Sequence, residues 1–416
     1  MKRLARTAPV LALALVLAGC ELLGWYEGGS ATAAPSEEEA YVLFAPLRQT
    51  NVYLIDLDGD VVHEWELSGK PGNSVYLVEG GYLLATYGVP NAFRADGSAG
   101  GVELLNWEGD QIWSFELATD DANLHHDVDM MPNGNVLMIA WEKKSRTEAL
   151  QAGISSSQLP ASGEVWPTMI LEYNPALDAI VWEWHLWDHT LPAGWSADEH
   201  PEKIDLAYAT KMGMEDLFHC NSIDYNASLD QIVISSMASS EIWIIDHGLT
   251  TIEAAGPAGD LLYRYGNSQA YGGTGSQQFY GQHDAEWLES GNVLLFDNGG
   301  PRVRSYSRVV ELGLPDYGSG AFEDASIVWQ YGAASGDEHF FSHRISGAQR
   351  LESGNTLICE GDTGRFFEVT PSGSIVWEYV SPYTVSNRDG TTSSAVFRCE
   401  RYETDSPELA GTELGT

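Results

Sequence analysis

The segment VYLIDLDGDVVHEWEL, which runs from Val52 to Leu67, decides the fold because its pattern recurs along the chain. Each copy has an apolar strand, a turn that contains Asp, Gly or Asn, and a second strand in which Val or Ile precedes Trp or another large residue. Strands separated by such turns are typical of β-hairpins. Five further copies, two of them looser, begin at Val102, Ile170, Ile242, Val303 and Phe366.

A second pattern, a turn that is usually centred on glycine and is followed by an apolar strand, precedes these copies. Two hairpins per unit, repeated six times without helical periodicity, predict an all-β fold, a six-bladed β-propeller with four-stranded blades. A two-sheet sandwich is the alternative, but it predicts no such repeat. The second pattern begins at Glu79, Pro132, Ser228, Glu289 and Glu352, and Ala40–Pro46 is a degenerate first copy.

Most of the tryptophans recur at one position of the repeat, so we interpret them as residues that pack the blades against one another. Trp195 and Trp287 fall outside the pattern and are the better candidates for ligand contact. The repeat units are longer than ordinary blades. The excess length lies chiefly in two loops, 143–163 and 188–217.

The first twenty residues have the pattern of a lipoprotein signal. Lys2, Arg3 and Arg6 are basic, Ala8–Ala18 is apolar and too short to span a bilayer, and the residues that end at Cys20 fit a lipidation site. An ordinary secretory signal that is cleaved elsewhere is the alternative. We expect an exported lipoprotein whose only contact with the membrane is its lipid, and the Glu after the cysteine favours the outer membrane.

The predicted organisation follows from these patterns. Residues 1–19 form the signal peptide, residues 20–40 a lipidated flexible tether, residues 41–402 the propeller, and residues 403–416 a disordered C-terminal tail. The formal net charge of −39 at pH 7 argues against nucleic-acid binding and against attraction to anionic lipid surfaces.

Three cysteines remain once Cys20 is assigned to lipid. Cys359 and Cys399 both lie in the last repeat, and an exported compartment permits a disulfide between them, with free buried thiols as the alternative. Cys220 is expected to pack in the interior, because its side chain points away from those of its two neighbours on a strand.

Histidines occupy matching places in the repeats. His126 lies nine residues before Asn135, and His283 lies nine residues before Asn292. His219 precedes its turn by a few residues more. Equivalent repeat positions lie at the same depth of a propeller. We therefore expect these histidines to meet at the mouth of the central channel.

Two kinds of chemistry suit such a cluster. A metal site is one, because Asp127 and Asp284 offer further ligands, although the ligands would come from separate blades without short-range spacing. A covalent or acid–base site is the other, with one imidazole as nucleophile and the others as proton donors to an anion. No serine-hydrolase, P-loop or dinucleotide motif is present, and no metal or other cofactor is predicted.

Several longer segments together resemble the bacterial aryl-sulfate sulfotransferases. The resemblance covers residues 41–402, effectively the whole chain after the tether. It is carried by HHDVDMMPNGNVL from His125, FHCNSIDYNASLDQIVISS from Phe218, QHDAEWLESGNVL from Gln282 and GDTGRFFEVTPSGSIVWEY from Gly361.

The resemblance implies a six-bladed propeller that moves a sulfuryl group from a small aromatic sulfate ester to a phenol acceptor without a nucleotide donor. It places the nucleophile at His283 and further catalytic histidines at His219 and His126. It also implies substrate binding by Asn221 and His125.

One residue departs from the family pattern. Met237 follows Ser-Ser where the family has an arginine, and methionine can neither carry charge nor donate a hydrogen bond. Arg344, Arg302 and Arg304 are candidates to bind the sulfate instead, and Arg344 is our choice. Two alternatives to the transferase therefore stay open: a propeller lipoprotein that binds a ligand or partner without chemistry, and a metal-dependent hydrolase or lyase.

Overall fold

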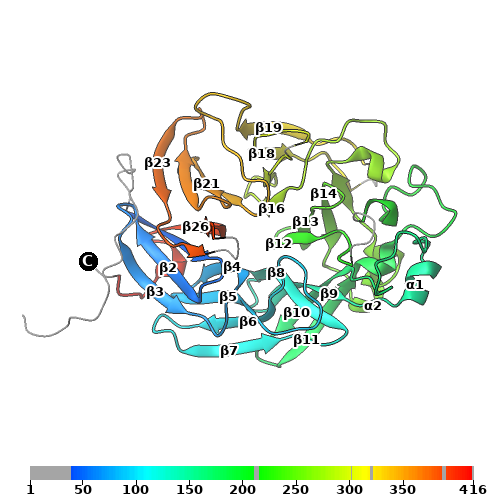
Figure 1. Ribbon diagram of the computed structural model, residues 1–416, viewed down its shortest axis with the longest axis horizontal. Coiled ribbons are helices and arrows are strands. Elements are labelled where there is room, and N and C mark those ends of the chain that lie inside the picture. Colours follow the sequence, from blue (N-terminus) through cyan, green and yellow to red (C-terminus); the bar gives the residue numbers. More distant parts are fainter. Residues whose placement is uncertain (1–38, 210–214, 301, 319–321, 387–389, 415–416) are drawn as a thin grey trace, which may run out of the picture.

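The computed structural model describes residues 39–209, 215–300, 302–318, 322–386 and 390–414. The predicted signal peptide, Cys20 and most of the tether lie outside these residues. In the part of the chain that is described, no helix is long and apolar enough to cross a membrane. The strands form sheets that are arranged around a central axis (Figure 1).

Four sheets have four antiparallel strands each. One of them combines the last long strand with the first three, in the order β26 (Val396–Glu403), β1 (Ala40–Pro46), β2 (Asn51–Asp56) and β3 (Val61–Glu66). The other three follow the chain. They are β12 (Cys220–Asn226), β13 (Gln231–Ser236), β14 (Glu241–Asp246) and β15 (Tyr263–Tyr265); β16 (His283–Trp287), β17 (Val293–Asp297), β18 (Arg308–Gly313) and β19 (Ser326–Tyr331); and β20 (Gly347–Arg350), β21 (Thr356–Glu360), β22 (Arg365–Val369) and β23 (Ile375–Val380).

A fifth sheet has eight strands and consists of two antiparallel runs. The first run is β4 (Pro71–Val78), β5 (Tyr82–Gly88), β6 (Gly100–Leu105) and β7 (Gln111–Glu116). The second is β8 (Ala122–Met130), β9 (Val136–Glu142), β10 (Thr168–Asn174) and β11 (Ala179–His185). Strands β4 and β8 join the runs through one parallel pair, Asn73 with His126.

The remaining elements are short. A two-stranded sheet pairs β24 (Val385–Ser386) with β25 (Thr392–Ser393). The helices are α1 (Arg146–Gln151), α2 (Thr251–Ala254), and the 3-10 turns η1 (Leu186–His189), η2 (Leu206–Tyr208), η3 (Pro257–Gly259), η4 (Ser268–Tyr271) and η5 (Pro407–Leu409).

The predicted all-β propeller is confirmed, but the prediction of six separate four-stranded blades needs correction. The described strands form four separate four-stranded sheets, because the other two runs are joined in the eight-stranded sheet. The cause is local: Asn73 has a φ of 140° and His126 a φ of 52°, and these irregular residues bring the inner strands within pairing distance. Strands β4, β8, β12, β16 and β26 lie nearest to the central axis (Figure 1).

The C-terminal strand closes the ring. Strand β26 pairs with β1 in a register that sets Tyr41 opposite Tyr402 and Phe44 opposite Cys399. Closure covers the strand edges that an open arrangement would expose. The predicted disordered tail is also corrected through residue 414, because Leu409 is buried and the amides of Gly80 and Gly81 donate to the carbonyl groups of η5.

The tryptophans of the repeat lie between sheets, as expected for residues that pack the blades. The indole N–H of Trp65 donates to the carbonyl oxygen of Asn106 in the following run at 3.1 Å, and that of Trp377 donates to Leu57 at 2.8 Å. Trp182 donates in the same way to Leu249 at 2.8 Å. Each such contact satisfies the one polar atom of a large apolar side chain, which fixes how neighbouring sheets stack.

Candidate active site

The inner strands lose regular register where the predicted histidines lie. The pairing of β8 with β9 and that of β16 with β17 both shift at these points. His126 (φ 52°), His219 (φ 48°) and Asp284 (φ 56°) adopt left-handed backbone. Such backbone is uncommon for residues other than glycine and concentrates at functional sites. A bulge redirects the side chains beside it, and here the redirected side chains come from three sheets.

The His283 imidazole is held in one tautomer by two oxygen acceptors. Its Nδ1 lies 2.8 Å from Asn298 Oδ1 and 3.0 Å from the carbonyl oxygen of Gly281. The Asn298 amide is oriented in turn, because its Nδ2 donates to the carbonyl oxygens of Ser342 at 2.9 Å and Ile345 at 2.8 Å. Nδ1 therefore carries the proton, and the Nε2 lone pair accepts the Ile345 N–H at 3.2 Å.

The protonation of His283 and His219 is set in opposite directions. The pKa of His283 is lowered to about 4, chiefly by burial and to a smaller extent by the charge of His219, against the Asn298 hydrogen bond, which acts to raise it. Burial also acts to lower the pKa of His219, but the charge and hydrogen bond of Asp216 raise it above its usual value. Near neutral pH, His283 is a neutral base and His219 is the more readily protonated partner.

The acidic partner of His219 is itself fixed. Asp216 contacts His219 Nδ1 through Oδ2, and its Oδ1 accepts the indole N–H of Trp141 at 2.8 Å. In this pair Asp216 acts like the orienting carboxylate of many acid–base sites, because it selects the tautomer of the histidine and stabilises the imidazolium. Asp216 stands only three residues before His219, and that spacing is the signal from which sequence reasoning could have found it.

His126 packs against both of the neighbouring histidines. Its ring centroid lies 4.6 Å from that of His219, and its Nδ1 lies 2.9 Å from His125 Nδ1. His125 stacks on Trp141 at 4.0 Å and is only 1% exposed, so it supports His126 and does not face open space. Burial and the charge of His219 lower the pKa of both buried imidazoles well below the usual range.

The three predicted catalytic histidines share one site. The ring of Phe397 on β26 lies 6.1 Å from His126 and 6.4 Å from His283, centroid to centroid. The charge of His283 also contributes to the lowered pKa of His126. A strand from the C-terminal end of the chain therefore helps to bring the three histidines together. His126 lies on β8, His283 lies on β16, and His219 directly precedes β12.

Asn221 is tied through its side chain to Gln282, the residue that precedes His283. The residue is fully buried, and its Nδ2 donates to the carbonyl oxygen of Gln282 at 2.9 Å. Gln282 is anchored by hydrogen bonds from its Nε2 to the carbonyl oxygens of Ser236 at 3.0 Å and Glu241 at 2.8 Å. The structure thus places Asn221 where it positions the strand that begins at His283.

Met237 and the candidate arginines differ in their surroundings. The N–H of Met237 donates to the carbonyl oxygen of His219 at 3.3 Å, so the methionine borders the histidines. Arg304 is held in an ion pair with Asp297, Nη2 to Oδ1 2.8 Å, and Arg302 is exposed. Arg344 is 55% exposed, and its Nε lies 3.1 Å from Asp362 Oδ1.

The two tryptophans outside the repeat have different environments. Trp195 is 50% exposed, stacks on His200 at 4.0 Å and lines a cavity of about 390 Å³ between the two long loops. Trp287 lies at the far end of β16 from His283 and packs against an apolar cluster.

The three cysteines in the described part of the chain are free thiols. Cys220 is fully buried in an apolar cluster, and burial raises its pKa to about 12, which fits the packing role. Cys359 and Cys399 are buried together in another cluster and form no disulfide.

Carboxylates on the inner strands bind the backbone of the neighbouring sheet. Arg398 pairs with two of them, at 3.2 Å from Asp127 Oδ2 and 2.7 Å from Asp284 Oδ1. Asp127 and Asp284, the two carboxylates that the sequence offered as metal ligands, are therefore engaged by protein groups. Among the described residues, no group of three or more His, Cys, Asp or Glu side chains is arranged to hold a metal ion. The backbone contacts are Asp127 with the N–H of Ile223 (3.1 Å), Asp224 with that of Trp287 (2.5 Å) and Asp284 with that of Ala348 (2.8 Å).

Comparison with known proteins is consistent with this arrangement. A family model described as Arylsulfotransferase (ASST) matches residues 31–397. No curated protein matches the chain. A crystal structure of a protein of unknown function from Bacteroides caccae is similar in fold, with a TM-score of 0.51 and 15% identity over 87% of this chain and 98% of that chain.

Two further solved structures are more distant. A functionally unknown protein from Desulfotomaculum acetoxidans has a TM-score of 0.42 and 11% identity over 82% of this chain and 95% of its own. A streptogramin B lyase has a TM-score of 0.41 and 10% identity over 90% and 96%.

Proposed function

Because the chain belongs to the arylsulfotransferase family, we propose that it transfers a sulfuryl group from a phenolic sulfate ester to a phenol through a sulfohistidine at His283. Family membership supports a sulfotransferase-type activity in general. The covalent intermediate, the residue roles and the phenolic substrates are our proposal. The reaction as proposed uses no cofactor.

The observation that carries the proposal is the state of the His283 imidazole. Asn298 and Gly281 accept from Nδ1, so the lone pair belongs to Nε2. Its pKa of about 4 keeps the ring neutral at physiological pH. A neutral imidazole oriented with its lone pair on Nε2 is what nucleophilic attack on sulfur requires, and the Ile345 N–H that contacts this lone pair must give way to the sulfur.

The two half-reactions balance with the groups of this site. His283 Nε2 attacks the sulfur, the bond from sulfur to the phenolic oxygen breaks, and the departing phenolate takes a proton from His219. An acceptor phenol then attacks the sulfur, its proton passes to His219, and the sulfur–nitrogen bond breaks. The Ile345 N–H, which faces Nε2 at 3.2 Å, is placed to donate to a sulfuryl oxygen once Nε2 is occupied.

The test is direct detection of the intermediate. After brief incubation with 4-nitrophenyl sulfate, we expect mass spectrometry to find about 80 Da added to the peptide that contains His283, the mass of a sulfuryl group in covalent catalysis. His283→Ala should abolish the adduct and reduce transfer to a phenol acceptor at least about 1000-fold. The matched control is His339→Ala, because that histidine is exposed and outside the site. An adduct on a different residue, or undiminished transfer by His283→Ala, contradicts the assignment.

Met237 favours a second candidate, a propeller that binds a sulfated aromatic ligand without turning it over. The methionine borders His219 where a family arginine would assist the reaction. This candidate predicts binding of 4-nitrophenyl sulfate with neither adduct nor release of nitrophenol. Adduct formation by the wild-type protein excludes it.

We further propose that Cys20 carries lipid and anchors the exported chain in the outer membrane, and that the two runs of the eight-stranded sheet act as separate blades, giving six. The first proposal rests on the sequence of residues 1–20 alone. The intact mass of the mature protein tests it, because cleavage before an acylated Cys20 gives a defined mass. The second rests on the single pair that joins the runs.

A further inference from the structure

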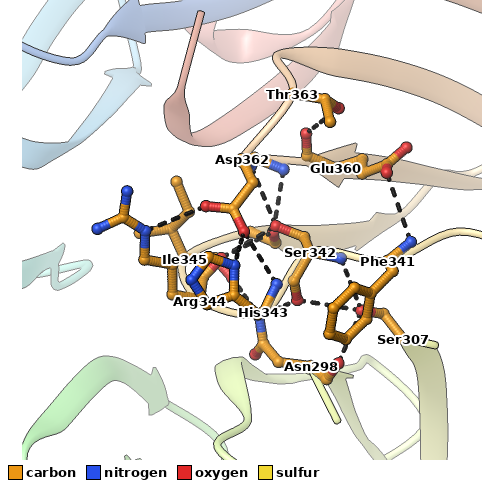
Figure 2. A network of polar contacts seen from close by, with 12 residues as sticks. Asn298, Ser307, Phe341, Ser342, His343, Arg344, Ile345, Glu360, Asp362 and Thr363 are labelled. Atoms are coloured by element: carbon orange, nitrogen blue, oxygen red, sulfur yellow. Dashed lines mark hydrogen bonds and ion pairs between the residues drawn. The ribbon is translucent and has the colours of Figure 1, made fainter. Parts of the chain in front are cut away.

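One carboxylate positions two basic side chains at the edge of the site. Asp362 Oδ1 lies 3.1 Å from Arg344 Nε, and Oδ2 lies 2.5 Å from His343 Nδ1 and accepts the His343 N–H at 2.9 Å (Figure 2). The Arg344 and His343 side chains are 55% and 56% exposed, whereas Asp362 is 16% exposed. A largely buried carboxylate therefore presents two exposed basic groups to solvent.

The loop that carries them is bound to His283. Asn298 bridges the two, because its Oδ1 faces His283 Nδ1. Its Nδ2 donates to the carbonyl oxygens of Ser342 and Ile345, which lie beside it in Figure 2. Ile345, the residue after Arg344, directs its N–H at His283 Nε2. Arg344 is therefore the residue immediately before the backbone N–H that faces the proposed nucleophilic atom, His283 Nε2.

The guanidinium of Arg344 is only partly used. Its Nε contacts Asp362, and Figure 2 shows the two terminal nitrogens directed away from the loop, without a contact to the residues drawn. An arginine held by Nε keeps its two terminal N–H groups in a planar fork, the geometry that matches two oxygens of a sulfate or phosphate group.

Other arginines near the site are engaged differently. Arg304 and Arg308 both pair with Asp297. Arg398 is 7% exposed and pairs with Asp127 and Asp284 on the inner strands. Their charges are therefore bound by carboxylates of the protein.

We propose that Arg344 recognises the sulfate group of the substrate. It takes over the role of the family arginine at whose position this chain has Met237. The identity of the anion as an aryl sulfate monoester rests on the proposed function. Asp362 is the positioning residue, because it holds Nε and leaves both terminal nitrogens for two sulfuryl oxygens. This arginine clamp comes from the loop after β19 and not from the turn after β13 that holds Met237.

The experiment measures binding and transfer separately. Calorimetric titration with 4-nitrophenyl sulfate in the His283→Ala background gives affinity without turnover, and steady-state transfer to a phenol gives kcat/KM in the otherwise wild-type enzyme. We expect Arg344→Ala to weaken both by about 10- to 100-fold, the range for a charge-assisted hydrogen bond to a ligand. Arg344→Lys should recover part of the loss, because it keeps the charge without the fork. Arg146→Ala on α1, an exposed arginine outside the site, is the matched control.

A rescue variant separates recognition from general damage to the loop. Met237→Arg added to Arg344→Ala should restore affinity if the two positions serve the same group. Thermal melting of each variant checks that the fold is intact, and Arg344→Gln replaces Arg344→Ala if the latter melts early.

The outcomes distinguish the clamp from the function. Normal binding and transfer by Arg344→Ala and Arg344→Gln overturn the clamp and leave the transferase standing. Binding that depends on Arg344 without any transfer supports the clamp and overturns the transferase. A wild-type protein that does not bind 4-nitrophenyl sulfate overturns the clamp as stated.

Discussion

At the scale of single residues, the position of His126 depends on a glycine in a loop between β5 and β6. Gly97 has a φ of 86°, and a Cβ built on it would lie 2.0 Å from two ring atoms of His126. The Gly97 carbonyl oxygen also accepts the His126 N–H at 2.9 Å. The Gly97 backbone and the His125 ring therefore confine the His126 imidazole to one position.

We therefore expect Gly97→Ala to displace His126, which packs against the proton donor His219, and to lower kcat/KM for sulfuryl transfer by about 100-fold, the scale of losing one positioned acid–base group. Steady-state kinetics with 4-nitrophenyl sulfate measures the loss. Gly134→Ala is the matched control, because Gly134 has a φ of 80° in the turn after β8 but open space around a Cβ. Both variants should lose about 1 kcal/mol of folding free energy from backbone strain, and Gly97→Ala should lose more because its Cβ displaces a buried ring. Equal kinetics in the two would show that the contact with His126 is unimportant.

The sequence predicted which histidines converge but not what holds them. Repeat spacing was sufficient for His126 and His283, because equivalent positions lie at one depth of a propeller. Asn298 and Asp362 were missed, since each acts through contacts between segments distant in sequence, and no local pattern marks a side chain that binds across sheets. The left-handed backbone at His126 was missed because propensity assigns such a φ to glycine or asparagine.

At the scale of elements, the repeat predicted the hairpins because alternation and turn residues are local properties. The six copies of the first motif correspond to the outer strand pairs, from β2–β3 to β22–β23, and the tryptophans within them bind the next sheet. The number of separate sheets was wrong because pairing between β4 and β8 depends on one residue from each. The C-terminal 3-10 turn was missed because its acidic, polar sequence gives no periodic signal.

Side-chain oxygens on one inner strand accept backbone N–H groups of the neighbouring inner strand, as the carbonyl groups of a paired strand would. Asp224 on β12 accepts the N–H of Trp287 on β16, and Ser222 accepts that of Ala285 at 2.9 Å. We expect Asp224→Ala to lower the free energy of unfolding by about 1–3 kcal/mol, because it leaves a poorly solvated backbone N–H without an acceptor. Denaturant titration measures the change. Asp224→Asn is the control, since its carbonyl oxygen can still accept, and an equal loss in both variants would show that charge, not the hydrogen bond, stabilises the junction.

At the scale of the whole molecule, acidic side chains gather where the inner strands meet. Burial raises the pKa of Asp224 to about 6, and burial with the charges of Asp127 and Asp224 raises the pKa of Glu400 to about 7, against the attraction of Arg398. At a pH between the ordinary and the raised pKa of such a carboxyl group, the folded protein keeps the group protonated, whereas the unfolded chain has already released that proton. The buried histidines act in the opposite sense, because a lowered imidazole pKa makes folding less favourable as the pH falls below about 6.5.

Glu400 tests this balance, because its own effect on stability has a defined sign. Its folded pKa of about 7 exceeds the ordinary value of 4.5, so stability from the protonated side chain is complete below about pH 4.5 and is lost as the pH rises toward 7. Glu400→Gln, which cannot ionise, should match the wild type near pH 4.5 and exceed its unfolding free energy by about 1–2 kcal/mol above pH 7, less than full burial would give because the side chain is partly accessible. Denaturant titrations from pH 4.5 to 8 measure the difference between the two proteins, so the opposing contribution of the histidines cancels. Exposed Glu352→Gln is the control and should show no such pH-dependent gain, whereas a difference in Glu400→Gln that is constant with pH would mean that repulsion among the central carboxylates does not weaken the fold.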